Sequence, residues 1–227
     1  MATRFHITSQ DGTQIAAYEA APLAKPRGAV VVLQEIFGLN THICSVVDGY
    51  AARGYYALAP ATFQRVSPGI ELGYTPEDIQ QGMALKAAAE ALASQVLQDV
   101  QAAVDYAAKD SGCKVGVVGY CWGGLLAWRA ATKLSGVSAA VPYYGGGMTG
   151  ELDLTPRCPT MAHLSDNDPS VPLDGVAALL KAHPGVHVHL YSAAHGFNCN
   201  QRGAYQEAAA MQARERTLAF FEQYLAC

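Results

Sequence analysis

The sequence predicts an α/β protein in which a mostly parallel sheet is covered by helices on both faces. Two apolar runs, "AVVVLQ" at 29–34 and "KVGVV" at 114–118, have the composition of strands buried on both sides. Predicted strands alternate with helical stretches through the middle and end of the chain, which is typical of parallel β–α–β units. The 227 residues suit a single domain over 1–227, without repeats or a dividing linker.

The chain begins with a predicted β-hairpin, because the Asp-Gly pair at 11–12 separates two β-prone runs. A proline-rich connector then leads into the 29–34 strand, which the loop "EIFGLN" follows. Thr41 is the expected N-cap of a helix that ends at about Arg53. These segments form the N-terminal part of the predicted sheet and its first covering helix.

From residue 55 onward the predicted elements alternate. Pro60 ends a strand at 55–60, and residues 61–76 contain Pro and Gly without a clean period, so we expect them to cross the surface. Helical composition dominates from about 77 to 108. The later strands are expected at 114–118, 138–145, 160–164 and 186–191. Of the later helices, one is expected to end at about 134, one to lie near 173–182 and the last to span about 204–224.

Composition argues against several classes of partner. Hydrophobic residues make up 51% of the chain and charged residues 15%, which favours a sizeable ordered core. The net charge is −4 without a long basic run, so nucleic acid and anionic membranes are poor partner candidates. No apolar signal segment or run of about 18 apolar residues is present, and we expect a cytoplasmic protein that acts on a small molecule.

The cysteines are scattered and form no C-x-x-C pair, which argues against a zinc ribbon or a thioredoxin-type motif. In a cytoplasmic chain of this size we expect them to be free thiols, so that a thiol nucleophile stays usable. The six positions are Cys44, Cys113, Cys121, Cys158, Cys199 and Cys227.

One cysteine occupies a distinctive corner. The stretch "GYCWG" at 119–123 has the spacing G-x-S-x-G with Cys121 in place of serine, and it lies between a predicted strand and a predicted helix. The flanking glycines are explained if the turn leaves no room for a Cβ atom. A helix N-terminus also favours thiolate over thiol at Cys121. The alternative is a buried structural cysteine beside a glycine-rich turn.

A nucleophile at such a corner needs an acid and a histidine that follow later strand ends in that order. Asp166 and Asp168 come directly after one predicted strand, and His195 comes after the next. Aspartates in a D-N-D-P turn are usually turn formers. His187 and His189 alternate along a strand, so we expect them to be structural. The coincidence of order and topology favours the catalytic interpretation.

A fourth feature is Glu35, which follows the 29–34 strand. A carboxylate at the C-terminal end of a strand lies where ligands bind in parallel sheets. The plainer interpretation is a solvated loop acid.

Together these stretches resemble the dienelactone hydrolase (carboxymethylenebutenolidase) family, which has the α/β-hydrolase fold. The matching stretches are "QEIFGLN" (34–40), "GYCWGG" (119–124), "DPSVP" (168–172), "AAHGF" (193–197) and "ERTLAFF" (215–221). The resemblance implies that Cys121 is the nucleophile and His195 the base. It implies that Asp168 rather than Asp166 is the acid of the triad. It also implies that Glu35 helps to activate the thiol when substrate binds.

The resemblance further implies an oxyanion hole made by the backbone N–H groups of Ile36 and Trp122. Two departures concern the arginines that hold a substrate carboxylate in the family. One should lie four residues after the histidine, where this chain has Cys199, and the other in the helical region after residue 76, where no Arg occurs. Arg202 and Lys86 are the substitutes that the sequence offers.

The implied reaction is hydrolysis of a carboxylic ester or lactone through a thioester acyl-enzyme, with no metal or organic cofactor. One alternative is a general carboxylesterase or thioesterase with a different acyl pocket. A second is a non-catalytic binding protein on the same fold. A third is a metal site that includes His195 and Cys199, although their spacing is unconvincing for zinc. The oligomeric state is left open.

Overall fold

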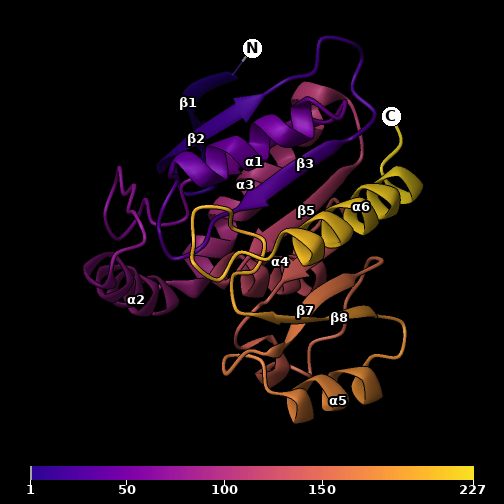
Figure 1. The fold of residues 1–227 in the computed structure, drawn as a ribbon. Coiled ribbons are helices and arrows are strands. Elements are labelled where there is room, and N and C mark those ends of the chain that lie inside the picture. Colours follow the sequence, from indigo (N-terminus) through magenta and orange to yellow (C-terminus); the bar gives the residue numbers. More distant parts are fainter. Residues whose placement is uncertain (1) are drawn as a thin grey trace.

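The computed structural model describes residues 2–227 and contains an eight-stranded sheet of strand order β1-β2-β4-β3-β5-β6-β7-β8 (Figure 1). β1 and β2 form the predicted antiparallel hairpin, β2 pairs antiparallel with β4, and the remaining neighbours are parallel. The strands are β1 (Ala2–Thr8), β2 (Gln14–Ala20), β3 (Ala29–Leu33), β4 (Tyr56–Pro60), β5 (Val115–Tyr120), β6 (Val137–Tyr143), β7 (Met161–Asn167) and β8 (His187–Ala194).

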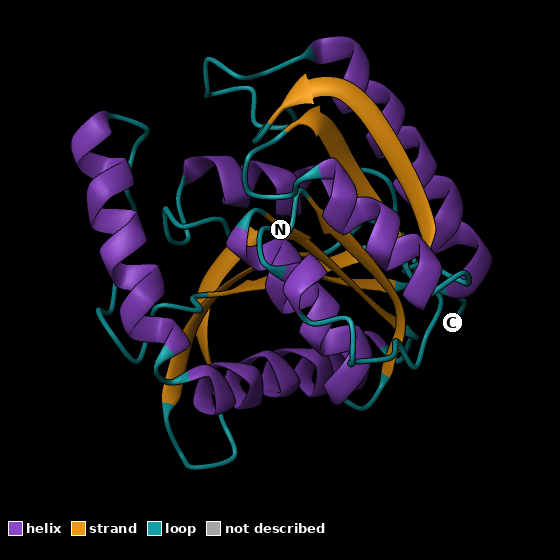
Figure 2. Ribbon diagram, turned by 90° about the horizontal axis from the view of Figure 1, so that it is seen from below, coloured by secondary structure: helices purple, strands orange, loops and turns teal. Residues whose placement is uncertain are grey.

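Helices cover both faces of this sheet, as Figure 2 shows, so the predicted fold class is confirmed. The central strands divide their side chains between two cores. Val31 and Leu33 of β3 belong to the core on one face, whereas Val30 and Val32 belong to the core on the other. The helices are α1 (Thr41–Ala51), α2 (Pro76–Glu90), α3 (Ala93–Ser111), α4 (Trp122–Lys133), α5 (Leu173–Ala182) and α6 (Glu207–Tyr224), with a 3₁₀ turn at Met148–Gly150.

The two cores follow from the apolar faces of four helices. Side chains of α3 and α4, such as Val100 and Trp128, pack in the core that contains Val31. Side chains of α1 and α6, such as Val47 and Phe221, pack in the core that contains Val30. Among residues 2–227, no helix is both long enough and apolar enough to cross a lipid bilayer.

Two local predictions need correction. The N-cap of α1 is Asn40, whose side-chain oxygen accepts a hydrogen bond from the N–H of Ile43, and Thr41 is the first helical residue. The helical stretch predicted over 77–108 is two helices, α2 and α3, that meet at 91–92. The break has no Gly or Pro signal. α2 buries only Gly82 and Ala89 within its own length and lies to the side of the sheet (Figure 1).

The prediction that all six cysteines are free thiols is wrong for two of them. Cys113 and Cys227 form a disulfide across a sequence separation of 114 residues. The C-terminal tail docks beside the start of β5, where the side chain of Leu225 is buried and the N–H of Lys114 donates to the carbonyl of Ala226. Docking of this tail brings the last residue to Cys113, and no spacing pattern in the sequence announces it.

Candidate active site

Cys121 lies at the turn between β5 and α4 with a strained backbone, at φ 56° and ψ −117°. Its N–H donates to the carbonyl of Tyr143 at 3.1 Å. A Cβ atom on Gly119 would lie 1.9 Å from the carbonyl oxygen of Gly123, and a Cβ on Gly123 would lie 2.3 Å from that of Leu33. The steric reason predicted for both glycines is therefore confirmed, because no other residue fits either position.

Asp168 and His195 are hydrogen-bonded to each other. Oδ2 of Asp168 lies 2.7 Å from Nδ1 of His195, and Oδ1 accepts a hydrogen bond from the N–H of Ser170 at 2.8 Å. Asp168 is buried, whereas Asp166 is exposed near the end of β7. The structure thus brings Asp168, and not Asp166, to the histidine.

The electrostatics of His195 connect it to the cysteine at the turn. Burial disfavours the charged imidazolium, but hydrogen bonding to Asp168 and to Cys121 outweighs burial and raises the pKa of His195 to about 10. Cys121 is thus one of the two side chains that raise the pKa of this ring. Cys121, His195 and Asp168 therefore form one connected set at the C-terminal edge of the parallel strands.

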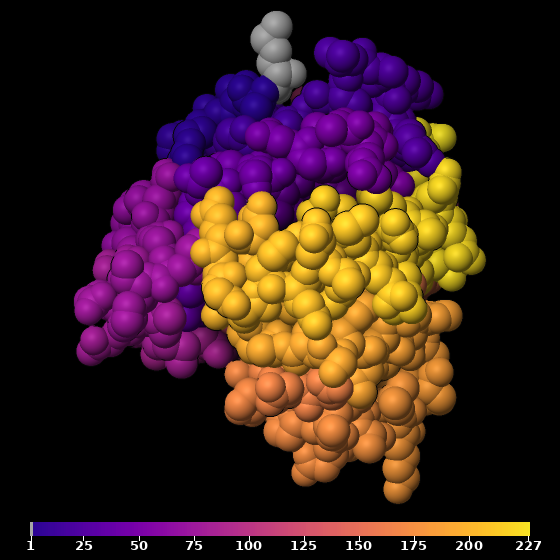
Figure 3. Space-filling model, in the orientation of Figure 1, coloured from indigo at the N-terminus to yellow at the C-terminus, as the bar shows by residue number. Residues whose placement is uncertain are grey.

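Glu35 and Arg202 form an ion pair at the same edge. Glu35 is 1% exposed, and its Oε1 accepts a hydrogen bond from Nη1 of Arg202 at 3.1 Å. The guanidinium lies over the ring of Phe37, 5.6 Å from its centroid. Burial of Arg202 disfavours its charge, but Glu35 and then Cys121 raise the pKa of the guanidinium. Through this ion pair the segment "CNQRG" (199–203) folds back toward Glu35. In Figure 3 it lies within the golden to yellow surface of the C-terminal residues.

The two residues that the family resemblance implies for the oxyanion hole are Ile36 and Trp122. Ile36 lies in the loop between β3 and α1, and Trp122 is the first residue of α4. Among residues 2–227, neither of their backbone N–H groups pairs with a backbone carbonyl. The indole of Trp122 is fixed in place, since its Nε1 donates to Glu90 at 2.6 Å and its ring stacks on Phe63 at 4.9 Å. Both amides are thus free to bind an acceptor that is not part of the chain.

Lys86 is not brought into this arrangement. It lies on α2, one turn after Gly82, where a Cβ would lie 2.4 Å from the carbonyl oxygen of Ile36. The charge of Lys86 acts on Glu90, which is itself paired with Arg129. Within the described residues 2–227, no ion pair includes Lys86.

Sequence reasoning missed two residues at this edge, Tyr144 and His42. Tyr144 directly follows β6 with a φ of 37°, and its ring lies 5.1 Å from that of His195. Its position after a strand end was the available signal. His42 and Cys199 lie beside Glu35, with one donor atom of each within 4.8 Å of the others. Cys199 therefore groups with Glu35 and His42, and not with His195 as the predicted metal alternative required.

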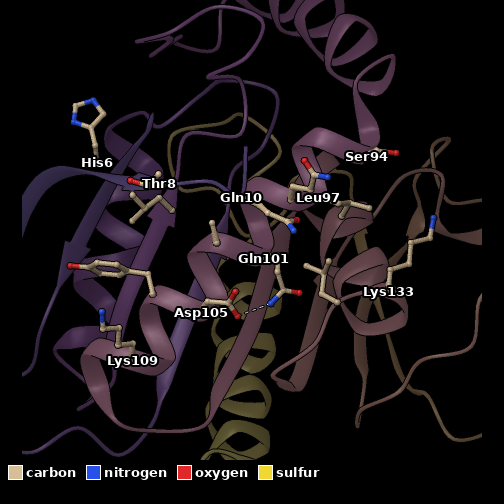
Figure 4. Close-up of a pocket in the computed structure, with 14 residues that line it drawn as sticks. His6, Thr8, Gln10, Ser94, Leu97, Gln101, Asp105, Lys109 and Lys133 are labelled. Carbon is tan, nitrogen blue, oxygen red and sulfur yellow. Dashed lines mark hydrogen bonds between the residues drawn. The ribbon is translucent and has the colours of Figure 1, made fainter. Parts of the chain in front are cut away.

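A further cavity lies apart from these residues. It has a volume of about 960 Å³, and most of the side chains that line it come from β1 and α3 (Figure 4). Its lining includes a hydrogen bond from Gln101 to Asp105 at 2.8 Å. Cys121 and His195 are not among its lining residues, so this groove does not serve the site.

Comparison with known proteins bears on the same residues. Residues 15–225 match the dienelactone hydrolase family. The chain is 35% identical over 231 residues to the "Putative carboxymethylenebutenolidase" of Synechocystis, with 93% of each chain covered. It is 34% identical over 223 residues to the carboxymethylenebutenolidase of Pseudomonas putida, covering 94% of this chain and 93% of that protein. The chain belongs to the dienelactone hydrolase family. Membership identifies it as a carboxylic-ester hydrolase and confirms the predicted resemblance.

A solved structure agrees with this assignment. The "Putative Dienelactone Hydrolase" of Klebsiella pneumoniae has a TM-score of 0.82 and 29% sequence identity to this chain, and 99% of each chain is covered. The α/β-hydrolase architecture of this dienelactone hydrolase family member therefore extends over nearly the whole of its length.

Proposed function

We propose that this enzyme hydrolyses small carboxylic esters or lactones through a thioester formed on Cys121. The observation that carries the proposal is the 2.7 Å pair of His195 and Asp168 at the corner where Cys121 sits on its strained turn. The carboxymethylenebutenolidase relatives support a lactone as the substrate. Neither metal nor organic cofactor is required for this chemistry.

We assign each step of the proposed reaction to a group of the chain. The Cys121 thiol gives its proton to His195, its sulfur attacks the carbonyl carbon, and the oxyanion is bound by the free amides of Ile36 and Trp122. Loss of one such donor typically lowers kcat by about 10²–10³-fold. The carbon–oxygen bond then breaks, and the leaving oxygen takes a proton from His195. Water attacks the thioester, gives a proton to His195 and releases the acid product and the Cys121 thiolate.

The raised pKa of His195 fits both halves of this cycle. Before acylation, Asp168 and Cys121 raise the pKa of His195 to about 10, so the ring holds a proton for the leaving group. Acylation converts the thiolate into a neutral thioester and removes one of these two causes. The pKa of His195 is then expected to fall, which allows the ring to accept a proton from water.

The test of the proposed function is a pre-steady-state burst with a chromogenic ester. One equivalent of alcohol released per active site before steady state would demonstrate an acyl-enzyme, and digestion of the quenched protein would locate the acyl group on Cys121. A general esterase of the same fold would show the burst but would not discriminate between lactones and simple esters. A non-catalytic binding protein would show no burst, and this result would overturn the proposal.

Arg202 supports a substrate that carries a carboxylate. A charge-assisted hydrogen bond to a carboxylate contributes about 1.5–3 kcal/mol, which corresponds to about 10–100-fold in kcat/KM. With a single arginine at the site, we expect a dienelactone to be preferred over its methyl ester by about this factor. In Arg202→Gln the preference should fall to nearly one. Because the measurement is a ratio for two substrates in one protein, general damage to the site cancels.

Two outcomes would contradict the expected role of Arg202. A carboxylate preference that persists in Arg202→Gln would show that another group binds the substrate carboxylate. Lys86→Gln would then be tested with the same pair of substrates. Equal turnover of acid and methyl ester by the wild-type enzyme would show that no carboxylate is recognised.

Glu35→Gln is expected to slow acylation and to alter the pH dependence of kcat/KM. In the structure the Glu35 carboxylate is paired with Arg202. A substrate carboxylate that binds Arg202 replaces Glu35 as its counterion and frees the Glu35 carboxylate to take part, as a base, in removing the thiol proton of Cys121. The pH–rate profiles of Glu35→Gln and of Glu71→Gln, an exposed control, should therefore differ. Identical pH–rate profiles for the two variants would show that Glu35 has no part in activating the thiol.

We also propose a cytoplasmic location, which supports the maintenance of a free thiol at Cys121. Cys44, Cys158 and Cys199 are also free, whereas the Cys113–Cys227 disulfide is less typical of that compartment.

A further inference from the structure

Glu35, His42 and Cys199 form a buried cluster with the donor atoms of a metal site. The carboxylate oxygen, the imidazole nitrogen and the thiol sulfur that they offer all lie within 4.8 Å of one another. Glu35 comes from the loop after β3, His42 from the first turn of α1 and Cys199 from the loop after β8. The hydrolytic steps proposed above use only Glu35 of the three.

The cluster contains buried polar atoms that no group of the chain satisfies. His42 is 3% exposed, and neither of its ring nitrogens has a hydrogen-bond partner within the described residues. The side chain of Asn200 approaches the ring without forming a well-aligned bond. Oε2 of Glu35 is also buried without a partner in this part of the chain. Buried polar atoms normally have partners, so this group is suited to bind something that the polypeptide does not supply.

We propose that Glu35, His42 and Cys199 bind a zinc ion. Nitrogen, sulfur and carboxylate donors are the zinc set, whereas magnesium and calcium take oxygen ligands only. Bonds of about 2.0–2.3 Å place the donors of a tetrahedral zinc site about 3.3–3.8 Å apart. Because all three donors lie within 4.8 Å of one another, they need to move together by no more than about 1–1.5 Å to bind the ion. Three protein ligands leave the fourth position to water.

The protonation states of the free cluster fit this binding step. Burial lowers the pKa of His42, so its ring is neutral and offers a lone pair. Burial raises the pKa of the Cys199 thiol to about 11, so zinc must displace a proton from sulfur into solvent when the bond forms. The carboxylate of Glu35 and the thiolate then balance the two positive charges of the ion, which suits a cluster of buried side chains.

Zinc at this cluster would act on the proposed reaction through Glu35. Oε1 of Glu35 accepts the hydrogen bond from Arg202, while Oε2 is free for the metal. A zinc ion on Oε2 occupies the carboxylate that would otherwise take part, as a base, in removing the thiol proton of Cys121. We therefore expect zinc to inhibit turnover, and this part of the inference rests on the proposed function.

Metal binding is tested with cobalt(II) and zinc in the Cys121→Ala protein, in which the proposed nucleophile cannot act as a ligand. One equivalent of cobalt should give tetrahedral visible bands and a thiolate charge-transfer band. Zinc should displace it with release of about one proton per ion, measured by calorimetry in two buffers. The charge-transfer band should vanish when Cys199→Ser is added and persist when Cys158→Ser is added as the control.

A second ligand variant tests the zinc site in case Cys199→Ser does not fold. His42→Gln should weaken zinc binding at least about tenfold while keeping the thiolate band at saturating cobalt, because sulfur still ligates. The absence of saturable binding in Cys121→Ala would overturn the site, as would a thiolate band that survives Cys199→Ser. These binding measurements use a catalytically inactive protein, so a negative result would overturn the zinc site without bearing on the proposed hydrolase reaction.

The inhibition is tested on the protein with Cys121 intact. Zinc should lower kcat/KM in parallel with occupancy of the site, and an added chelator should restore it. The residual activity of Cys199→Ser should respond at least about tenfold less to zinc than that of Cys158→Ser. Equal sensitivity of the two variants would overturn the inhibitory role and would assign inhibition to Cys121 and His195.

Discussion

Replacing Cys121 with alanine is expected to lower kcat for ester hydrolysis by at least about 10⁴-fold, the scale seen when a nucleophile is removed from a triad. The acyl-enzyme cannot form without the sulfur, and the burst of alcohol release should disappear. The fold should persist, because Ala keeps the Cβ atom and therefore adds no new strain at a backbone φ of 56°. Steady-state turnover and the thermal unfolding midpoint together check both expectations.

The matched control for this substitution is Cys44→Ala, which removes another partly buried free thiol from α1. It should retain wild-type turnover. Alkylation of the wild-type enzyme should mark Cys121 and abolish activity in parallel, because Cys121 lies at a helix N-terminus beside His195. Substantial burst kinetics in Cys121→Ala would show that another residue is the nucleophile.

The sequence was sufficient to predict those parts of the site that depend on short local patterns. The G-x-C-x-G spacing predicts the corner at Cys121 because the backbone excludes side chains at Gly119 and Gly123. Asp168 and His195 follow the ends of neighbouring parallel strands, and such ends meet at one edge of the sheet. Strand composition and topology therefore placed these side chains in one region without any knowledge of tertiary contacts.

The parts that the sequence left open, or did not indicate at all, depend on how loops and tails dock. The position of Arg202 required its loop to fold back, which only the ion pair with Glu35 shows. His42 and Cys199 lie 157 positions apart in sequence and meet only because both pack against Glu35. The Cys113–Cys227 disulfide likewise follows from docking of the C-terminal tail. Contacts of this kind leave no periodic or spacing signal in one sequence.

Replacing Asp168 with asparagine is expected to lower kcat by about 10³–10⁴-fold, as loss of the orienting carboxylate does in comparable triads. The substitution keeps the shape of the side chain and the hydrogen bond from Ser170 to Oδ1. It removes the charge that acts on His195 and allows the ring to adopt the wrong tautomer. Asp166→Asn is the matched control, since this exposed residue near the end of β7 should tolerate the change with an effect of less than about threefold.

The same pair of variants gives a pH signature whose sign follows from the raised pKa of His195. Hydrogen bonding to Asp168 is a principal cause that raises this pKa from its ordinary value of 6.5 to about 10. The interaction therefore stabilises the fold fully below pH 6.5, and its contribution declines as pH rises toward 10. The difference in unfolding free energy between wild type and Asp168→Asn should be largest near pH 6 and shrink toward pH 10, while Asp166→Asn shows no such trend. A large kcat loss in Asp166→Asn with little in Asp168→Asn would reassign the triad acid.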